Sequence, residues 1–222
     1  MAKTALIAGA SGLTGSHCLD FLLNNDAYDK VISIGRNELK ANHPKLEQII
    51  TDFSDLKEIL PGLKADDVFC CLGTTIKKAG SKEAFKKVDY EYPLLIAKLA
   101  KANGAKGFHF VSAIGASADS FFFYSQVKGE LEEEIMKVDF ENANILRPSI
   151  LDGDRKESRP AEKIGLMAAK FISPLLVGSF SKFKPTKAKA VGYVMVEMAT
   201  KGIKGLSIIE SDQIEQIYRK RR

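Results

Sequence analysis

Short apolar runs alternate with amphipathic segments along the first 150 residues of the chain. These runs are predominantly apolar, with one or two polar residues in each, and fall at residues 4–8, 30–34, 46–50, 67–72, 107–111 and 144–147. The amphipathic segments fall at 13–23, 92–103 and 121–138, where apolar residues recur at helical spacing. Strands that are apolar throughout are typical of parallel sheets covered on both faces. The alternation of five or six such strands with helices predicts an α/β fold: a Rossmann-type doubly wound parallel sheet with helices on both faces.

The pattern changes after residue 150. A polar, charged loop at 152–160 is followed by helical patterns at about 161–171 and 187–200, and then by a short apolar run at 206–209. We expect a single domain in which residues 1–150 form the Rossmann core. Residues 151–222 would form a small C-terminal extension that packs over the carboxyl end of the sheet, where α/β proteins bind their ligands, and covers a substrate cleft.

The first apolar run leads directly into a glycine-rich turn, residues 9–15. Gly9 permits a tight turn, Gly12 lets the backbone approach a phosphate, and Gly15 lets the next helix pack closely on the strand. That helix would direct free N–H groups and its positive dipole end toward a pyrophosphate. This context favours a dinucleotide site over an ordinary glycine-rich turn. The residues predicted to hold the cofactor here are Gly9, Ser11, Gly12, Leu13, Thr14 and Gly15.

Arg36 follows the second predicted strand, at the position where an acidic residue would hold the ribose 2′-hydroxyl of NAD(H). A guanidinium pairs with a 2′-phosphate and can stack on adenine, so Arg36 predicts NADP(H) in preference to NAD(H). The alternative is a solvated arginine in a turn. Asp52, with Phe53 beside it, follows the third strand, where it can reach adenine or cap a short helix starting near residues 54–55.

Several other polar residues have simpler structural interpretations. Gly73 lies at the carboxyl end of the fourth predicted strand, where it gives a cofactor room. The five lysines at 77–87 are interpreted as a solvated helix face rather than as groups that neutralise cofactor phosphate. His109 is interpreted as a core histidine, and the acidic run 132–134 as the solvated face of its helix. Phe121–Phe123 are interpreted as core and helix-entry residues rather than as an apolar cleft wall.

Tyr124 and Lys128 are four residues apart, so a helix places them on the same face, and Ser112 ends the fifth strand twelve residues before Tyr124. A phenol has an ordinary pKa of about 10, which a nearby ammonium lowers. Tyr124 could then exchange a proton with a substrate alcohol or carbonyl, while Ser112 holds the substrate oxygen and Lys128 also holds the nicotinamide ribose. The nicotinamide would supply the hydride.

With these residues the chain resembles the atypical, extended short-chain dehydrogenase/reductase superfamily, and within it the Tat-interacting-protein-like branch. The matching stretches are Gly-Ala-Ser-Gly-Leu-Thr-Gly (9–15), Ile-Gly-Arg (34–36), Cys-Cys-Leu-Gly-Thr-Thr (70–75), Lys-Ala-Gly (78–80), Tyr-Ser-Gln-Val-Lys-Gly-Glu (124–130) and Asp-Arg-Lys-Glu-Ser-Arg-Pro (154–160).

The resemblance implies an NADP(H)-binding Rossmann fold with Ser112, Tyr124 and Lys128 in the catalytic positions. It also implies that Leu72, Gly73 and Thr74 line the cofactor, and that the backbone from Pro148 to Ile150 touches the nicotinamide. Eukaryotic members are discussed as regulators that bind proteins. One departure is Ala113, which stands where a second serine is expected.

Composition adds limits. With 45% hydrophobic and 27% charged residues and no long apolar run, the chain is typical of a soluble globular protein. Its three cysteines, two of them adjacent, indicate reduced thiols rather than disulfides, and neither Cys nor His spacing suggests a metal site. The N-terminus shows no signal-peptide pattern, so we expect a cytoplasmic location. The basic tail 219–222 could touch nucleic acid or acidic lipid, but without an accompanying motif a solvated, mobile terminus is favoured.

The sequence thus supports two classes of function. The first is an NADP(H)-dependent oxidoreductase acting on a small carbonyl or alcohol, with nucleotide-sugar epimerase chemistry as a variant for which the chain is short. The second is an NADP(H)-sensing module that binds other proteins without significant turnover. Retention of the complete Ser112, Tyr124 and Lys128 set favours the enzyme, because a sensor has no need of all three.

Overall fold

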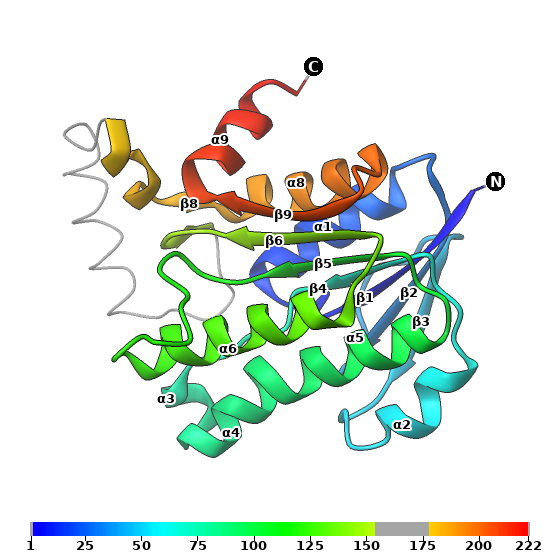
Figure 1. Ribbon diagram of the computed structural model, residues 1–222. Coiled ribbons are helices and arrows are strands. Elements are labelled where there is room, and N and C mark those ends of the chain that lie inside the picture. The colour runs from blue at the N-terminus through cyan, green and yellow to red at the C-terminus, as the bar shows by residue number, and fades with distance from the viewer. Residues whose placement is uncertain (1, 154–177, 222) are drawn as a thin grey trace.

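The computed structural model describes residues 2–153 and 178–221. Its main sheet has seven parallel strands in the order β3-β2-β1-β4-β5-β6-β9 (Figure 1). The strands are β1 (Lys3–Ala8), β2 (Tyr28–Gly35), β3 (Leu46–Ile50), β4 (Asp67–Cys70), β5 (Gly107–Val111), β6 (Asn142–Arg147) and β9 (Gly205–Glu210). A separate two-stranded ribbon pairs β7 (Leu151–Asp152) with β8 (Thr186–Lys187).

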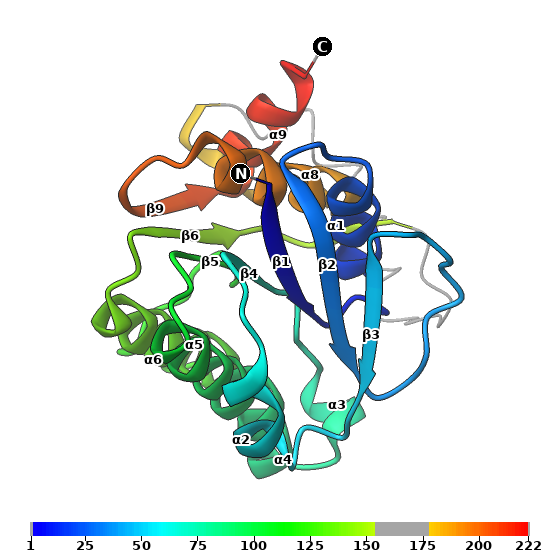
Figure 2. The same cartoon turned by 90° about the vertical axis from the view of Figure 1, so that its right-hand side faces the viewer.

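Helices cover both faces of the main sheet, as Figure 2 shows from the side. One face carries α1 (Leu13–Leu23) and α8 (Ala188–Lys201), and the other carries α5 (Tyr92–Ala102) and α6 (Phe123–Val138). The remaining helices are α2 (Leu56–Ile59), α3 (Ile76–Ala79), α4 (Lys82–Lys86) and α9 (Ser211–Arg219). The doubly wound fold predicted from the sequence is therefore confirmed.

The alternation of side chains along β1 explains why its last four residues, 5–8, are all apolar. Ala5 and Ile7 belong to the hydrophobic core under α1 and α8, whereas Leu6 and Ala8 belong to the core under α5 and α6. Each strand residue is therefore buried on one side or the other. Because β1 has β2 on one side and β4 on the other, the strand order reverses at this point. Sheets of this kind bind ligands beyond the carboxyl ends of the strands at such a reversal, here β1 and β4.

The C-terminal part of the chain contributes more to the sheet than the sequence predicted. β9 extends the sheet to a seventh strand by pairing in parallel with β6, and α8 packs directly on α1. Gly192 of α8 allows this contact, because a Cβ there would lie 2.7 Å from the Cys18 backbone nitrogen. Residues 154–177, which include the charged motif at 154–160 and the helix predicted at 161–171, lie outside the described residues.

The basic tail predicted to be solvated begins within helix α9, and its residues 219–221 are exposed. Helix α9 begins with a capping box, in which Glu210 and Gln213 each accept a hydrogen bond from the other's backbone N–H. Beyond the helix, the Arg221 guanidinium lies 3.4 Å from the centre of the Tyr218 ring. Both interactions involve side chains that sequence periodicity does not single out.

The start of α6 corrects a second interpretation. The helix begins at Phe123 rather than Phe121, and Phe121 is fully exposed while Phe122 is 77% exposed. These two residues therefore lie at the entry of the helix, as predicted, but they are not core residues. Phe123 does pack inward, since its ring centre lies 5.8 Å from that of Phe85.

Candidate functional site

The glycine turn between β1 and α1 is packed so tightly that side chains would collide with backbone. Gly9 has a φ of +86°, and a Cβ on it would lie 2.7 Å from the carbonyl group of Cys71. A Cβ on Gly15 would lie only 2.0 Å from the Gly9 carbonyl oxygen. The turn is closed by a hydrogen bond from Gly12 N–H to the Gly9 carbonyl, 3.0 Å long. Gly9 therefore permits the tight turn, and Gly15 permits the close packing of helix on strand, as the sequence predicted for these two positions.

The first turn of α1 fits an anionic ligand. Gly12 caps the helix without a side-chain hydrogen bond, so the helix N-terminus presents backbone N–H groups and the positive end of the dipole. Thr14 is buried, and its Oγ1 has no hydrogen-bond partner within the described protein. A buried hydroxyl without a partner is costly, and a phosphate oxygen would satisfy it. Ser11 and Gly12 are exposed on the outer side of the same turn.

The residues predicted to reach the adenosine part lie beyond β2 and β3. Arg36 is exposed directly after β2. Phe53 is buried with its ring stacked on Tyr92, at a centre-to-centre distance of 5.3 Å, so its side chain faces the core. Asp52 is exposed and accepts hydrogen bonds from the Ser54 N–H and hydroxyl, which lower the pKa of Asp52.

These contacts decide one alternative for Asp52. Helix α2 begins at Leu56 with Asp55 as its N-terminal cap residue, so Asp52 does not cap it. The capping interpretation is wrong, and contact with adenine remains a prediction.

The loop after β4 is held by a residue that sequence reasoning missed. Thr74 N–H donates to Asp89 Oδ2 over 2.8 Å, and a Cβ on Gly73 would lie 3.5 Å from Asp89 Oδ1. Leu72, Gly73 and Thr74 therefore follow β4 in a conformation set by this carboxylate. Asp89 lies in a wide π-helical turn, Lys87–Glu91, between α4 and α5. Turns of this kind are often found at functional sites.

Asp89 also forms a buried ion pair with Lys128. Asp89 Oδ1 is 3.0 Å from Lys128 Nζ, and the two side chains are 1% and 4% exposed. Burial lowers the pKa of Lys128, but the Asp89 carboxylate and the neighbouring Tyr124 outweigh it, so the pKa is raised overall and the ammonium stays charged. The signal that could have identified Asp89 is its position four residues after buried Phe85, which places it on the inner face.

Tyr124 lies in the first turn of α6, on the same face as Lys128. It is 41% exposed, and its ring centre is 5.7 Å from that of Phe85. Its electrostatic effect on Lys128 indicates that phenol and ammonium share one local environment. The helix thus brings the predicted Tyr and Lys together, with the phenol at the surface and the ammonium beneath it.

Ser112 is buried in a different environment. Its hydroxyl donates to Glu132 Oε1, and Arg147 holds the same carboxylate through Nε at 3.0 Å and through a second nitrogen at 2.5 Å. Arg147 also reaches Glu210 at 3.2 Å. Because the Ser112 proton is donated to Glu132, only the lone pairs of its oxygen can accept a further hydrogen bond.

This arrangement corrects the interpretation of the acidic run at 132–134. Glu133 is exposed, but Glu132 is buried and joins β5, α6 and β6. Its position four residues after Lys128 continues the spacing that begins at Tyr124, so the same helix face carries all three side chains.

We expect Glu132→Ala to destabilise the fold by about 3 kcal/mol, because it leaves Ser112 and part of Arg147 without their buried acceptor. Urea unfolding monitored by circular dichroism measures the loss. Glu133→Ala is the matched control on the exposed neighbour and should change stability by less than about 0.5 kcal/mol. Equal losses for the two variants would contradict a structural role for the Glu132 carboxylate.

The backbone from Pro148 to Ile150 lies beyond the carboxyl end of β6. The Pro148 carbonyl accepts from Ile114 N–H over 2.9 Å, and the Ile150 carbonyl accepts from Thr186 N–H over 3.0 Å. These bonds tie the segment to the loop after β5 and to the β7–β8 ribbon. The Ile150 side chain remains partly exposed.

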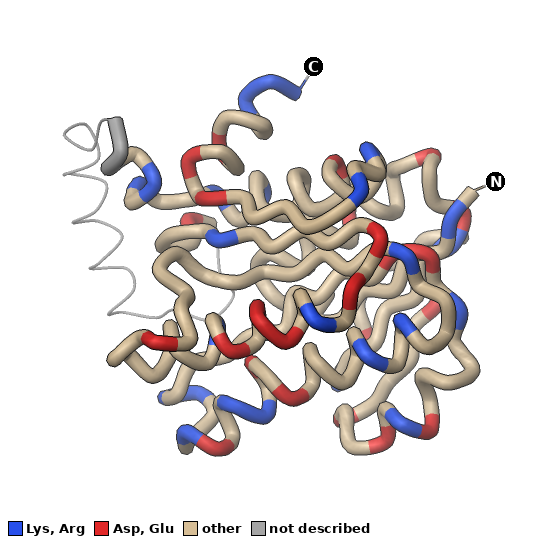
Figure 3. Tube along the Cα trace, in the orientation of Figure 1, with Lys and Arg blue, Asp and Glu red and all other residues tan. Residues whose placement is uncertain are grey.

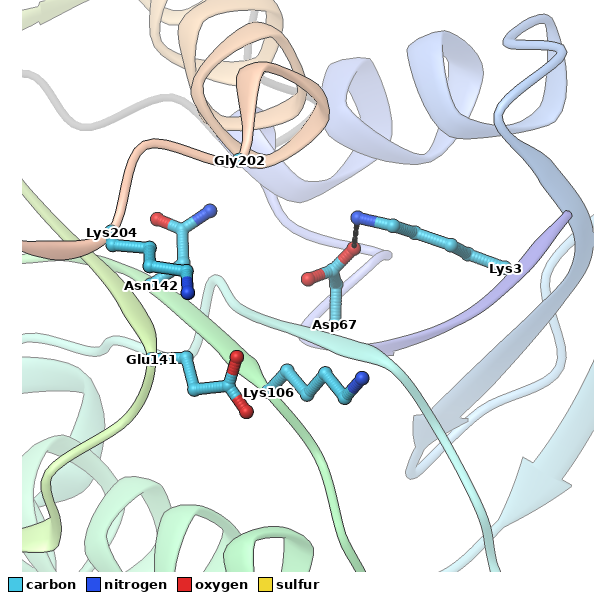
Figure 4. Close-up of a pocket in the computed structure, with 7 residues that line it drawn as sticks. All are labelled: Lys3, Asp67, Lys106, Glu141, Asn142, Gly202 and Lys204. Carbon is cyan, nitrogen blue, oxygen red and sulfur yellow. Dashed lines mark hydrogen bonds and ion pairs between the residues drawn. The ribbon is translucent and has the colours of Figure 1, made fainter. Parts of the chain in front are cut away.

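A small pocket lies at the opposite, amino-terminal end of the sheet and is not part of this site. Figure 4 shows its lining, where Lys3 Nζ binds Asp67 Oδ2 at 3.0 Å. Asp67 also accepts from the Tyr28 hydroxyl over 2.8 Å. Behind it, His109 is fully buried, takes a hydrogen bond from Asn144, and has its pKa lowered by burial. The interpretation of His109 as a core residue is confirmed.

The lysines of α3 and α4 and the three cysteines agree with their interpretation as solvated side chains and reduced thiols. Lys77, Lys78 and Lys82 are exposed, and Figure 3 shows the lysines of α3 and α4 gathered at the lower edge of the molecule. Cys18, Cys70 and Cys71 are free thiols. In the described residues, no cluster of three or more His, Cys, Asp or Glu side chains could hold a metal ion. No helix in residues 2–153 and 178–221 has the length and apolar character needed to cross a membrane.

Comparison with known proteins identifies the family. Residues 9–163 match the model of a family described as NAD(P)H-binding. The chain belongs to the NAD(P)H-binding family. Among its relatives, Protein HTATIP2 of Rattus norvegicus is 37% identical over 216 residues, covering 96% of this chain and 88% of the relative. Protein FMP52, mitochondrial, of Candida albicans is 37% identical over 209 residues, covering 91% and 90%. These relatives confirm the resemblance to the Tat-interacting-protein-like branch.

Solved structures share the fold of this NAD(P)H-binding family member at low sequence identity. A UDP-glucose 4-epimerase of Thermotoga maritima, solved with UDP-glucose, superimposes with a TM-score of 0.70 at 15% identity, covering 97% of this chain and 80% of the epimerase. A short-chain dehydrogenase family protein of Francisella tularensis gives 0.67 at 16% identity, covering 97% and 100%. Both confirm the Rossmann architecture.

The relatives correct the expected location. The FMP52 proteins of Candida albicans, Lodderomyces elongisporus and Emericella nidulans are all named as mitochondrial. The expectation of a cytoplasmic location is therefore wrong. Reduced thiols occur in proteins of several compartments, so they did not distinguish between them.

Proposed function

We propose that the protein is an NADP(H)-dependent oxidoreductase that transfers a hydride to or from a small carbonyl or alcohol. The observation that carries the proposal is the buried, charged Lys128 beneath the partly exposed Tyr124, on the helix that follows β5. A buried ammonium is costly to maintain, and a lysine facing a tyrosine is the arrangement that tunes a phenol for proton transfer. The glycine turn and Thr14 support a nucleotide phosphate nearby.

In the proposed reaction, backbone N–H groups of residues 12–15 and the Thr14 hydroxyl hold the pyrophosphate. When bound, the nicotinamide supplies or accepts the hydride. The Tyr124 hydroxyl gives a proton to the carbonyl oxygen during reduction and takes one from the alcohol during oxidation. Lys128 stabilises the phenolate form and holds the nicotinamide ribose. In the free protein the Ser112 hydroxyl donates to Glu132. With substrate present it turns to donate to the substrate oxygen, which leaves the single proton of the alcohol for Tyr124.

The remaining predicted contacts complete the cofactor site in this proposal. The backbone of Leu72, Gly73 and Thr74 lines the cofactor beside β4, and the segment from Pro148 to Ile150 lies along the nicotinamide. Asp52 and the Phe53 backbone lie by the adenine.

The experiment that tests the function is a titration with NADPH, followed by a screen of carbonyl compounds for NADPH oxidation. Binding with turnover supports the oxidoreductase. Tight NADPH binding without turnover on any compound would favour the cofactor-sensing module. Transient reduction of bound NADP⁺, together with net inversion at one carbon of a nucleotide sugar, would favour the epimerase variant. The screen includes nucleotide sugars because a UDP-glucose 4-epimerase shares this fold.

Arg36 provides a sharp test of the cofactor. We expect NADPH to bind more tightly than NADH, and Arg36→Glu to weaken NADPH binding by about tenfold to a hundredfold, because the substitution replaces a charge-assisted pair with repulsion. NADH affinity should change much less. Fluorescence titration of both cofactors measures the four constants.

Lys40→Glu is the matched control for Arg36→Glu, since Lys40 is an exposed cation four residues further along the same loop. If both charge reversals weaken NADPH binding equally, the effect is general electrostatics rather than a contact with the 2′-phosphate. A wild-type preference for NADH would show that Arg36 is only a solvated loop residue.

A further inference from the structure

A buried carboxylate lies against the ammonium that the proposed reaction uses. Asp89 Oδ1 is 3.0 Å from Lys128 Nζ, and both side chains are almost completely buried. Water screens such a pair weakly, so each charge acts strongly on its surroundings. Because the pair is neutral as a whole, a phenol beside it experiences less positive potential than it would beside an unpaired ammonium.

The other ionisable groups around the Asp89–Lys128 pair add no net charge that would alter its effect on Tyr124. Cys70, on β4, lies close enough to interact with both members, but burial raises its pKa to about 12 and keeps the thiol neutral. Lys82, on α4, is exposed and lies 5.1 Å from the centre of the Phe123 ring, where solvent screens it. The nearby carboxylates of α6 are neutralised in two further pairs, Lys86–Glu130 and Arg147–Glu132.

The same carboxylate also contacts the loop assigned to the cofactor. Its second oxygen accepts from Thr74 N–H over 2.8 Å, while the first lies within van der Waals distance of a Cβ placed on Gly73. The π-helical turn at Lys87–Glu91 directs Asp89 inward, whereas Lys87 and Glu91 at its ends are exposed. Asp89 therefore joins the lysine of α6 to the loop after β4.

We propose that Asp89 is a positioning residue that holds the Lys128 ammonium and offsets its charge, so that Tyr124 keeps its proton until a positively charged ring lies beside it. The oxidised nicotinamide is such a ring and the reduced nicotinamide is not. Proton release from Tyr124 is thereby coupled to the oxidation state of the cofactor. This inference rests on the proposed function for the roles of Tyr124 and Lys128.

An NMR titration of the labelled tyrosine ring carbon that bears the hydroxyl tests the inference on the full chain without substrate. The chain has six tyrosines, and Tyr124→Phe identifies the signal of Tyr124. Asp89→Asn removes the negative charge and retains an acceptor for Thr74 N–H. We expect it to lower the pKa of Tyr124 by about one unit, a tenfold change in the ionisation constant. An unchanged Tyr124 titration would overturn the proposal.

Two further variants establish the route of the effect. Glu130→Gln makes the same carboxylate-to-amide change two residues from Lys128, on a group paired with Lys86, and should leave the Tyr124 titration unchanged. The double variant Asp89→Asn, Lys128→Met removes both charges, so the pKa of Tyr124 should return to the wild-type value or rise above it. If the double variant titrates like Asp89→Asn, the carboxylate acts on Tyr124 without Lys128 and the proposal fails.

The wild-type protein supplies a second measurement should Asp89→Asn not fold. With NADP⁺ bound, the ionisation constant of Tyr124 should be about ten times larger than with NADPH bound. Equal titrations in the two complexes would overturn the coupling.

The titration separates this inference from the proposed function because it requires no turnover. Suppose that Asp89→Asn shifts the pKa of Tyr124 but that none of the carbonyl compounds causes the protein to oxidise NADPH. That result would contradict the oxidoreductase and would support the charge coupling. Turnover that depends on Tyr124, with no shift in Asp89→Asn, would support the oxidoreductase and reject the role of Asp89.

Discussion

Tyr124→Phe is expected to reduce kcat by a factor of about a hundred to ten thousand, while the dissociation constant for NADPH stays within about twofold. The substitution removes one oxygen and keeps the ring against Phe85, so the packing at the start of α6 is preserved. The hydroxyl is the group that donates the proton to the carbonyl in the proposed reaction. Steady-state turnover of a substrate found in the carbonyl screen, together with NADPH titration, measures both quantities.

Tyr193→Phe is the control for Tyr124→Phe. Tyr193 lies on α8 on the other face of the sheet, where its hydroxyl donates to Glu197 over 3.3 Å, and its loss should leave kcat unchanged. Turnover that survives Tyr124→Phe would remove the phenol from the mechanism. Equal losses of NADPH affinity and of kcat would indicate that the variant disturbs the cofactor site rather than proton transfer.

The parts of this site that follow from local sequence were predictable. The glycine turn is set by three residues within seven positions, and Tyr124 and Lys128 share a helix face because they are four residues apart. The sheet was predictable for the same reason: its strands are predominantly apolar, and helices separate successive strands from β1 to β6 except β2 and β3. In each case the signal is contained in a short stretch of chain.

The charged residues beneath the site were not predictable in this way. Asp89 and Glu132 both belong to segments rich in charge, where most side chains are solvated, and each is buried because its partner arrives from another element. Lys128, the partner of Asp89, lies 39 residues later in the sequence, and Arg147, the partner of Glu132, lies on β6. Burial of a charged group depends on such tertiary partners, so composition favours the exposed interpretation until the fold is known.

Strand β9 and helix α9 show the same limit for secondary structure. Of the six residues of β9 only Ile209 is buried, because β9 is an edge strand with a single neighbour, β6. Its apolar pattern is therefore short, and its inclusion in the sheet is decided by pairing with β6. Helix α9 starts from a capping box whose members, Glu210 and Gln213, lie at the end of that strand. Neither element is strongly marked by local propensity.

Gly15→Ala is expected to lower the free energy of unfolding by about 3 kcal/mol and to weaken NADPH binding at least tenfold, because the added methyl group has no space. Its Cβ would lie 2.0 Å from the Gly9 carbonyl oxygen and 2.8 Å from the Gly9 carbonyl carbon. Both atoms belong to the backbone of the turn, so no side chain can move aside. Either the turn shifts or α1 moves away from β1.

The two effects are measured separately, by urea unfolding and by NADPH titration at a urea concentration where the variant is still folded. Gly62→Ala is the control, since a Cβ on Gly62 meets nothing within 4 Å, and it should change neither quantity appreciably. A displaced turn would move the N–H groups at the start of α1 and the Thr14 hydroxyl together. Loss of stability with unchanged NADPH affinity would therefore show that the cofactor phosphate does not depend on this turn, and would reject the glycine site on which the proposed function relies.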